Sequence, residues 1–268
     1  MSWASDGPRP EREKRKAAPP VTVDGLTVAY GGAPPILENI NLTIEAGEIF
    51  GILGSSGSGK SSLLRHLIGL APPRKGRIKL FGRDLWADGG RRLGECRRLF
   101  GMMYQAGALF GSLTLMENVA LPLREFTRLS PGSVRAAARL KLALVGLAGF
   151  EHHLPAHISG GMRKRAAIAR AMALEPGLIF LDEPSAGLDP ITSAELDRLI
   201  VTLARNLGIA FGVVTHELNS VMSIVDRAIL LDRASRGIVA EGRPPELAMR
   251  IEPPFVAAFF NRRPLEHH

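Results

Sequence analysis

A glycine-rich loop of this chain reads Gly54-Ser55-Ser56-Gly57-Ser58-Gly59-Lys60-Ser61, and it lies between the apolar run Ile49–Leu53 and the helix-forming stretch Ser62–Leu70. A G-x-x-x-x-G-K-[S/T] pattern between a strand and a helix is typical of a phosphate-binding loop. Its glycines let the backbone approach phosphate oxygens, so that successive N–H groups and the positive end of the helix face the anion. We therefore expect an α/β domain whose loop, together with Ser62, binds the phosphates of ATP.

Two side chains at the end of this loop are expected to carry its chemistry. Lys60 has the length and charge to reach the β- and γ-phosphates of ATP, and the Ser61 hydroxyl can hold Mg²⁺. Pro72 and Pro73 are expected to end the helix, because proline has no backbone N–H to continue it. An ordinary glycine-rich turn is the alternative, and the strand and helix beside the loop argue against it.

A pair of carboxylates follows a second apolar run. Leu178–Leu181 predicts a buried strand, and Asp182 and Glu183 come directly after it. Ligands bind at the carboxyl ends of strands in open α/β sheets, and successive side chains of a strand diverge, so the two acids are expected to have different roles. We expect Asp182 to bind Mg²⁺ through water and Glu183 to orient or deprotonate the attacking water.

A histidine follows a third apolar run. Phe211–Val214 predicts another buried strand, and Thr215 and His216 come after it. The carboxyl ends of parallel strands meet at one edge of a sheet, which would put the His216 imidazole beside the loop and the two acids. A lone histidine is more often structural than catalytic, but the neighbouring strand ends favour a contact between His216 and the γ-phosphate.

The remainder of the chain alternates strands and helices. Half-buried antiparallel strands are expected at Val21–Tyr30, Asn41–Glu45 and Gly76–Phe81, and further strands near Ala228–Leu231 and Gly237–Ala240. Ser130 and Pro131 are a typical helix N-cap and first residue, and they predict a helix to about Leu147. The sequence thus predicts a nucleotide-binding α/β core and a helical subdomain inserted at about residues 107–170.

The composition limits the class of protein. The 268 residues include one cysteine, Cys96, which suits a reducing compartment. No apolar run approaches the roughly 18 residues of a membrane span, and the N-terminus lacks the apolar segment of a signal peptide, so a cytosolic location is expected. The net charge of +8 favours an anionic partner without choosing among nucleotide, lipid headgroups and nucleic acid.

The two ends of the chain are expected to lie outside the folded domain. Residues 1–20 are rich in proline and charged residues and predict a disordered tail, and residues 265–268 resemble the remnant of an expression tag. The expected domain spans residues 21–250, and a C-terminal extension at 251–264 follows it. The extension contains the apolar cluster Phe255–Phe260, which is expected to pack either on the domain or across a dimer.

A further segment carries a resemblance to a known family. Ile158-Ser159-Gly160-Gly161-Met162-Arg163-Lys164-Arg165 resembles the signature motif of the ABC-type ATPases, at the start of a helix expected to run to Pro176. The resemblance extends from Tyr30 to Gly242, with the other motifs in the expected order. It implies ATP hydrolysis and an α/β fold: a P-loop NTPase ABC cassette with a RecA-like core, an antiparallel β subdomain and a helical subdomain.

The resemblance also implies roles for residues outside the phosphate loop. Tyr30 looks like the aromatic residue that stacks on adenine. Gln105 looks like the glutamine that links the metal ion and the water to the helical subdomain, which makes it both a metal-binding and a catalytic residue. Ser185-Ala186-Gly187-Leu188-Asp189 resembles the loop that crosses between paired subunits, and His216 resembles the switch histidine.

The signature motif implies a partner subunit. In ABC-type ATPases two cassettes face each other head to tail, and the residues matching Ser159, Gly160 and Gly161 contact the γ-phosphate held by the other subunit. This chain has one phosphate loop and one signature. The resemblance therefore implies a head-to-tail dimer with a second copy of the chain.

A closer resemblance is to the ATPase subunits of the Mla/Mce lipid transporters. It rests on Gln105–Phe110, Glu117–Glu125 and Met162, where most ABC cassettes have glutamine; a later glutamine of those cassettes is replaced here by Lys164. A methionine offers no amide to the ribose of ATP, so looser nucleotide selectivity is expected.

This resemblance implies a motor that uses ATP to drive phospholipid transport between bacterial membranes. Its implied partners are integral membrane permease subunits, and a lipid-carrying substrate-binding subunit is a further partner that the resemblance allows. The implied location is the cytoplasmic face of the inner membrane, where the chain would be held peripherally by the permease.

Two alternatives stay open. The first is the same motor on a permease for a small polar solute, which differs only in its partner. The second is a soluble ABC ATPase that acts on DNA or the ribosome, which the basic N-terminal tail favours. Such proteins usually carry two cassettes or a long coiled-coil insertion, whereas no sustained heptads separate Lys60 from Ser159 here. The leading hypothesis includes no nucleic acid partner.

Overall fold

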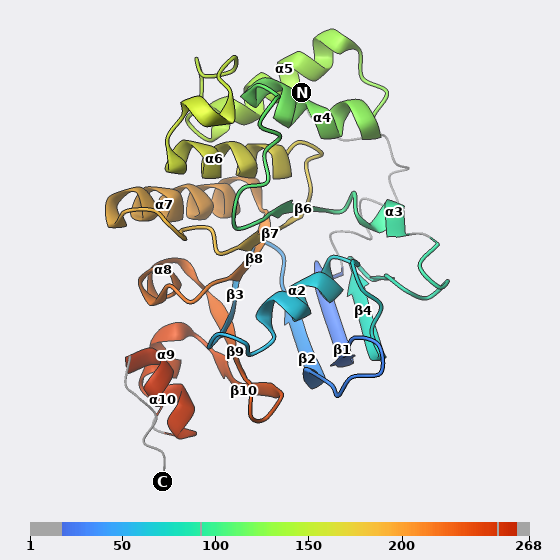
Figure 1. Cartoon of the computed structure of the whole chain (residues 1–268), viewed down its shortest axis with the longest axis vertical. Helices are drawn as coiled ribbons and strands as arrows, with labels where there is room; N and C mark the ends of the chain where they lie inside the picture. Colours follow the sequence, from blue (N-terminus) through green and yellow to red (C-terminus); the bar gives the residue numbers. More distant parts are fainter. Residues whose placement is uncertain (1–17, 92, 251, 262–268) are drawn as a thin grey trace.

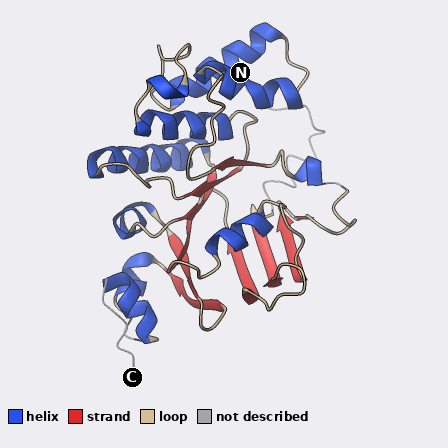
Figure 2. Cartoon of the chain, viewed as in Figure 1, coloured by secondary structure: helices blue, strands red, loops and turns tan. Residues whose placement is uncertain are grey.

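The computed structural model describes residues 18–91, 93–250 and 252–261 of the chain. The described residues form two sheets, with helices packed around them (Figures 1 and 2). Most of the expected disordered tail at residues 1–20, and the expected tag remnant at residues 265–268, lie outside the described residues.

The larger sheet contains six strands in the order β10-β9-β3-β8-β7-β6. These are β3 (Ile49–Gly54), β6 (Phe100–Met103), β7 (Leu178–Asp182), β8 (Ala210–Val214), β9 (Arg227–Asp232) and β10 (Gly237–Gly242). β10 runs antiparallel to β9, and the other neighbours are parallel. β3 and β8 are buried along their whole length and β7 along all but its last residue, which accounts for their continuous apolar sequences.

The register of the parallel strands brings the expected functional segments to one edge of this sheet. Ile52 of β3 pairs with Val214 of β8, and Asp182 of β7 pairs with the same valine. The loop after β3, Glu183 after β7 and His216 after β8 therefore leave the sheet together, as the sequence predicted.

The smaller sheet contains four antiparallel strands in the order β2-β1-β4-β5. These are β1 (Val21–Val28), β2 (Leu37–Ile44), β4 (Lys75–Leu80) and β5 (Arg83–Asp84). The expected start of β2 at Asn41 was wrong, since the strand begins at Leu37. Asn39 has a φ of +51°, and the pairing with β1 shifts register on either side of Leu26. This irregularity breaks the alternation of apolar residues that would have revealed the first half of the strand.

The principal helices between β3 and β9 pack against the sheets or against one another. They are α2 (Lys60–Leu67), α4 (Leu115–Phe126), α5 (Pro131–Leu144), α6 (Gly160–Ala171), α7 (Pro190–Leu207) and α8 (Leu218–Ile224). α4, α5 and α6 pack on one another, and α6 also contacts β6 and α7. Figure 1 shows these three helices gathered at one end of the molecule, coloured from green to yellow. The expected helix start at Ser130 is confirmed, because the Ser130 hydroxyl accepts a hydrogen bond from the Ser133 N–H.

The expected ends of three helices were wrong. α2, α5 and α6 end at Leu67, Leu144 and Ala171, before the expected Leu70, Leu147 and Pro176. Gly69 and Gly146 have φ values of +68° and +74°, and Glu175 has a φ of +52°. A residue with a left-handed backbone conformation can end a helix without a proline. These helices therefore end at local turns, before the residues at which they were expected to end.

The C-terminal apolar cluster packs on the domain. It forms α10 (Pro254–Asn261), which lies next to the short α9 (Pro244–Ala248). Val256 is buried, and Phe255, Phe259 and Phe260 pack against the core under the larger sheet. Of the two arrangements expected for this cluster, the structure shows packing on its own domain.

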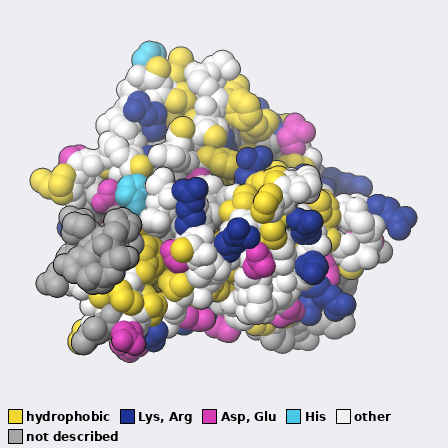
Figure 3. Space-filling view, turned by 60° about the horizontal axis from the view of Figure 1, so that its bottom comes forward, with side chains coloured by type: hydrophobic (Ala, Val, Ile, Leu, Met, Phe, Trp, Pro, Cys, Tyr) yellow, Lys and Arg dark blue, Asp and Glu magenta, His cyan; other side chains and the backbone are white. Residues whose placement is uncertain are grey.

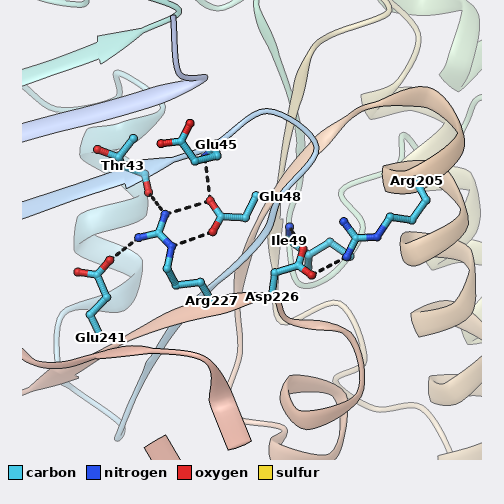
Figure 4. A network of polar contacts seen from close by, with 8 residues as sticks. All are labelled: Thr43, Glu45, Glu48, Ile49, Arg205, Asp226, Arg227 and Glu241. Atoms are coloured by element: carbon cyan, nitrogen blue, oxygen red, sulfur yellow. Dashed lines mark hydrogen bonds and ion pairs between the residues drawn. The ribbon is translucent and has the colours of Figure 1, made fainter. Parts of the chain in front are cut away.

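Arg227, at the start of β9, joins the two sheets through a polar network (Figure 4). Its guanidinium donates to the Glu48 carboxylate at 2.8 and 3.1 Å, to the Thr43 carbonyl of β2 at 2.7 Å, and to Glu241 of β10. It also lies over the Phe50 ring, 4.9 Å from the centroid. These contacts fix the amino end of β3 against both sheets, and the phosphate loop follows the carboxyl end of the same strand.

The described surface carries mixed charge. Figure 3 shows basic side chains spread over one face among apolar and acidic ones, without a single continuous stripe. Among the described residues, no helix combines the length and the hydrophobicity that crossing a bilayer requires.

A buried carboxyl between α7 and α8 is expected to destabilise the protein at neutral pH. Asp197 is 6% exposed, and its Oδ1 has no partner among the described residues. Burial raises its pKa, a hydrogen bond with Ser220 opposes this, and the Glu217 carboxylate adds to it. The unfolded chain releases this proton near the ordinary aspartate pKa of about 4, whereas the folded chain retains it to higher pH. Stability is therefore lost as the pH rises from about 4 toward the folded pKa.

Asp197→Asn removes this cost, and we expect a gain of about 1 kcal/mol in the free energy of unfolding at pH 8. The gain should shrink toward zero as the pH falls to about 4, in urea unfolding measured at several pH values. Asp24→Asn, at an exposed surface ion pair, is the control and should change stability little. A gain that is the same at every pH would contradict this account.

Candidate functional site

The phosphate loop joins β3 to α2 and requires glycine at two of its positions. Gly59 has a φ of +98°, and a Cβ there would lie 2.9 Å from the Leu37 side chain. Gly54 has a φ of +152°, and a Cβ there would lie 2.6 Å from the Leu231 carbonyl oxygen. The loop borders a cavity of about 1050 Å³ that is lined by the loop and the start of α2, by the end of β9 and the turn after it, and by Pro35, Ile36 and Phe255. The sequence thus forms an open cradle at the N-terminus of α2, where backbone N–H groups favour an anion.

Lys60 occupies this cradle. Its Nζ donates hydrogen bonds to the carbonyls of Gly54 at 2.7 Å and Ser55 at 2.8 Å. Burial lowers the pKa of Lys60, while the nearby carboxylates of Glu183 and Asp182 raise it. The ammonium therefore lies between the loop backbone and the two acids, within a cradle suited to phosphate oxygens.

Tyr30 lies beside the same helix. Its ring is 40% exposed and is tilted against the buried His66 of α2, with 5.7 Å between the ring centroids. His66 in turn hydrogen-bonds the Ser62 carbonyl at 2.8 Å. An exposed aromatic face next to the phosphate loop is suited to stacking on a nucleotide base.

Asp182 and Glu183 lie at the carboxyl end of β7. Burial raises the pKa of Asp182 and so does the Glu183 carboxylate, while Lys60 and Lys164 lower it. Glu183 has a φ of +48°, and its N–H donates to the Val214 carbonyl at 2.8 Å. Asp182 ends the strand and Glu183 begins the loop in a left-handed backbone conformation, so the two carboxylates differ in their surroundings.

His216 and Glu183 are hydrogen-bonded. The His216 Nδ1 lies 2.7 Å from the Glu183 Oε1, which assigns the proton to Nδ1 if the imidazole is neutral. The Glu183 Oε2 is buried and has no partner among the described residues. The pair therefore holds one carboxylate oxygen in place and leaves the other able to accept a proton.

The segment that contains Gln105 is held by α6. The Arg170 guanidinium donates to the carbonyls of Gly107 at 3.0 Å and Ala108 at 2.6 Å, and Lys164 donates to the Gln105 carbonyl. The Gln105 side chain is exposed and, within the described part of the chain, makes no hydrogen bond to the other candidate residues. The structure thus fixes its backbone and leaves its side chain exposed.

The signature segment forms the N-terminus of α6. The Ser159 hydroxyl accepts a hydrogen bond from the Met162 N–H at 3.2 Å, and Gly160 is partly exposed. A Cβ on Gly161 would collide with the Thr192 side chain of α7, which explains the glycine at this position. Figure 1 shows α6 and the loop at the start of α2 in separate parts of the molecule. The structure does not bring Ser159 and Gly160 to the chain's own phosphate loop.

Asp189 caps α7 next to the signature. Its Oδ1 accepts from the N–H groups of Ile191 and Thr192, both at 3.0 Å, and its Oδ2 accepts from the Thr192 hydroxyl at 2.6 Å. The hydrogen bonds from Thr192 lower the pKa of Asp189. The loop at residues 185–189 is thus anchored at its end to α7.

Two cations near the site were missed by the sequence analysis. Arg233, in the turn between β9 and β10, lines the cavity, and its guanidinium lies 3.9 Å from where a Cβ on Gly57 would be. Lys164 was noted only as a departure from the usual glutamine. Ala167 and Ile168, three and four residues later, are buried, so Lys164 lies on the buried face of α6. This helical periodicity could have identified Lys164 as a buried lysine.

The chain is similar to known proteins over most of its length. The family described as "ABC transporter" matches residues 37–186. A Mycobacterium tuberculosis protein named "Probable ribonucleotide transport ATP-binding protein mkl" is 42% identical over 256 residues, which is 96% of this chain and 70% of that protein. An Escherichia coli protein named "Intermembrane phospholipid transport system ATP-binding protein MlaF" is 43% identical over 218 residues, which is 81% of this chain and 80% of that protein.

A solved structure has the same fold. It is the dimeric post-hydrolysis state of the ATP-binding cassette MJ0796 bound to ADP and Pi. It matches with a TM-score of 0.75 at 32% identity and covers 84% of this chain and 98% of that one. The fold and the sequence point to the same group of proteins.

Proposed function

The chain belongs to the ABC transporter family, as a subunit that hydrolyses ATP, and from this premise we propose that ATP hydrolysis drives phospholipid transport by a separate permease. The observation that carries the proposal is the 43% identity, over 81% of this chain, to a protein named for intermembrane phospholipid transport. A second candidate function is transport of a polar solute, which is favoured by the relative named for ribonucleotide transport.

We propose that ATP lies along the loop from Gly54 to Ser62, with its base stacked on Tyr30. The open cradle of the loop and the exposed Tyr30 ring support this placement. Lys60 leaves its two carbonyl partners to bind phosphate oxygens, and Arg233 lines the same cavity near Gly57. The cationic side chains thus meet the anionic part of the nucleotide.

The residues present also fit a magnesium ion. Ser61, Asp182 and Gln105 offer the oxygen ligands that Mg²⁺ prefers, and Asp182 is a carboxylate whose pKa is raised by burial and by Glu183, so a cation would favour its ionised form. When bound, the ion neutralises charge on the phosphates. The Gln105 side chain is exposed, so it can change its rotamer to join this set.

In the proposed reaction Glu183 acts on the attacking water. Its Oε2, which is buried and has no hydrogen-bond partner in the described part of the chain, accepts the proton of a water molecule directed at the γ-phosphorus, while His216 holds Oε1. The exposed His216 ring is free to reach the γ-phosphate with its other nitrogen. The bond between them keeps the base oriented during proton transfer.

We propose that a second copy of the chain completes the site. Ser159 and Gly160 lie at the N-terminus of α6, away from the loop of their own chain, and they offer backbone N–H groups to an anion. A head-to-tail pair would place them on the γ-phosphate held by the partner. Binding of ATP would join the two copies, and hydrolysis would release them.

The permease is proposed to dock beside the Gln105 segment. Phe110 and Phe126 are 53% and 50% exposed, and the Arg98 guanidinium lies 5.2 Å from the Phe126 ring centroid. Exposed aromatic side chains of this kind are common at protein interfaces. Docking here would hold the chain at the cytoplasmic face of the inner membrane.

Purification from membranes tests the proposed partner. The full chain, tagged at its N-terminus and produced in its own host, should be recovered in mild detergent with an integral membrane protein, and extraction should release phospholipid at a fixed ratio to the complex. Phospholipid vesicles should raise the ATP turnover of this complex, and a panel of nucleotides and sugars should not. Stimulation by a polar solute alone, or recovery with nucleic acid and no membrane protein, would contradict the lipid proposal.

A further inference from the structure

Lys164 is a buried lysine that bonds to two segments of the site. It lies on α6, is 7% exposed, and its Nζ donates to the Gln105 carbonyl and, at 3.3 Å, to the Glu183 carbonyl. The first segment belongs to the loop before α4 and the second to the loop after β7, so the two accepting residues are far apart in sequence. Lys164 therefore joins these two segments through a single side chain.

The surroundings of Lys164 explain how a buried ammonium is tolerated there. Burial lowers its pKa, and the carboxylates of Glu183 and Asp182 raise it. A buried charge is costly unless it is paired and hydrogen-bonded, and here two carbonyls and two nearby carboxylates compensate it. An apolar side chain would avoid that cost, which indicates that the contacts of Lys164 serve a purpose other than stability.

Lys141 shows the contrasting case in the same group of helices. It is also 7% exposed, but its Nζ pairs with the Glu175 carboxylate at 3.1 Å. This pair links α5 to the turn after α6, and within the described residues it makes no hydrogen bond or ion pair to a candidate site residue. Two lysines with equal burial thus differ in whether they reach the site, which makes Lys141 a matched control.

The two backbones held by Lys164 are both irregular. Glu183 has a φ of +48°, and Gly107 and Ala108, next to the Gln105 bond, have φ values of +75° and +49°. Left-handed residues cost free energy and persist where surrounding contacts fix them. Arg170 fixes the Gly107 and Ala108 carbonyls from the same helix. Lys164 makes the contact to the Glu183 carbonyl, and this contact ties α6 to the residue that is proposed to activate water.

We propose that Lys164 is a positioning residue that sets the distance between the Gln105 segment and Glu183 and couples both to the signature helix. The inference rests on the roles proposed above for Glu183 and Gln105. Any movement of α6 when a partner's phosphate meets Ser159 would be passed through Lys164 to the backbone of the catalytic carboxylate. A displacement of about 1 Å in a catalytic group can lower a rate about a hundredfold, so the loss of a hydrogen bond at this place is expected to lower the turnover rate.

Kinetics of Lys164→Met test the proposal. In the full complex we expect kcat to fall about 10- to 100-fold, while the Kd for ATP, measured without Mg²⁺ by titration with a fluorescent ATP analogue, changes less than about twofold. Lys164→Gln should recover most of kcat, because its amide N–H groups can donate to carbonyls without a charge. Lys141→Met should lower the unfolding temperature and leave kcat unchanged.

A second measurement separates this inference from the roles of Glu183 and Gln105. Amide hydrogen exchange should quicken in the residues around Gln105 and around Glu183 together in Lys164→Met, and in neither in Lys141→Met. If Glu183→Gln turns over normally, the catalytic role of Glu183 fails, yet the paired change in exchange would still support the coupling. Exchange that changes in one segment or in none, or a Lys164→Gln variant as slow as Lys164→Met, would overturn the proposal.

Discussion

Glu183→Gln is expected to lower steady-state ATP turnover about 100- to 10,000-fold, the usual contribution of a positioned general base. The variant keeps the shape of the side chain and an oxygen that can accept from His216 Nδ1. It replaces the buried, unpartnered Oε2 with an amide nitrogen that cannot accept a proton. The measurement is phosphate release by the full complex at saturating Mg²⁺ and ATP.

ATP binding should survive this change, because the phosphate loop is untouched. We expect the Kd for ATP to stay within about threefold of its value in the unsubstituted protein, so the fall in turnover is a fall in kcat. Without hydrolysis the two copies should remain joined, and the isolated chain should elute as a dimer with ATP and as a monomer without it.

Glu195→Gln is the matched control. Glu195 is an exposed carboxylate on α7 that pairs with Arg165 of α6 at 2.7 Å, and surface ion pairs contribute little to stability. Its turnover should equal that of the original protein. Normal turnover in Glu183→Gln would remove Glu183 from its proposed role, and a loss of ATP binding in that variant would assign it to binding.

Lys60→Ala is expected to weaken ATP binding itself, by about 10- to 150-fold in Kd. A hydrogen bond from a charged group contributes about 1.5 to 3 kcal/mol, and the Lys60 ammonium lies inside the loop where the phosphates are proposed to bind. Its loss also removes a positive charge next to Asp182 and Glu183. Titration with a fluorescent ATP analogue measures the effect directly.

Lys79→Ala is the control for this loss of charge. Lys79 lies on β4 and pairs with Asp24 at 3.7 Å on the surface of the smaller sheet. Its removal should leave the Kd for ATP unchanged, which would separate a local effect from a change in net charge. Equal affinities for Lys60→Ala and the original protein would mean that the loop does not hold the phosphates as proposed.

The sequence by itself determined the buried central strands of the larger sheet and the phosphate loop. β3, β7 and β8 are apolar apart from Asp182 at the end of β7, because both faces of the sheet are covered, and such runs can be recognised without knowing the partner strands. The loop from Gly54 to Ser61 is equally local, since contiguous residues form the cradle and the helix that faces it. Motifs placed directly after these strands could therefore be assigned to one edge of the sheet.

Local patterns failed where a turn or an irregularity intervened. The first half of β2 was missed because Asn39 interrupts the alternation, and α6 was expected to continue past Ala171 because its sequence stays favourable for a helix. The four-residue β6 was missed because Phe100–Met103 is too short to show a period. Such boundaries depend on single residues whose backbone conformation tertiary contacts decide.

The tertiary structure alone decided which side chains meet. The bond between His216 and Glu183, the contact of Lys164 with both Gln105 and Glu183, and the approach of Arg233 to Gly57 join residues distant in the sequence. The first contact depends on the pairing of β7 with β8, the second on the way α6 packs against β6, and the third on the pairing of β3 with β9. Hydrophobic periodicity specifies which face of an element is buried, but a contact between two elements is fixed only when their packing sets the register and the distance between them.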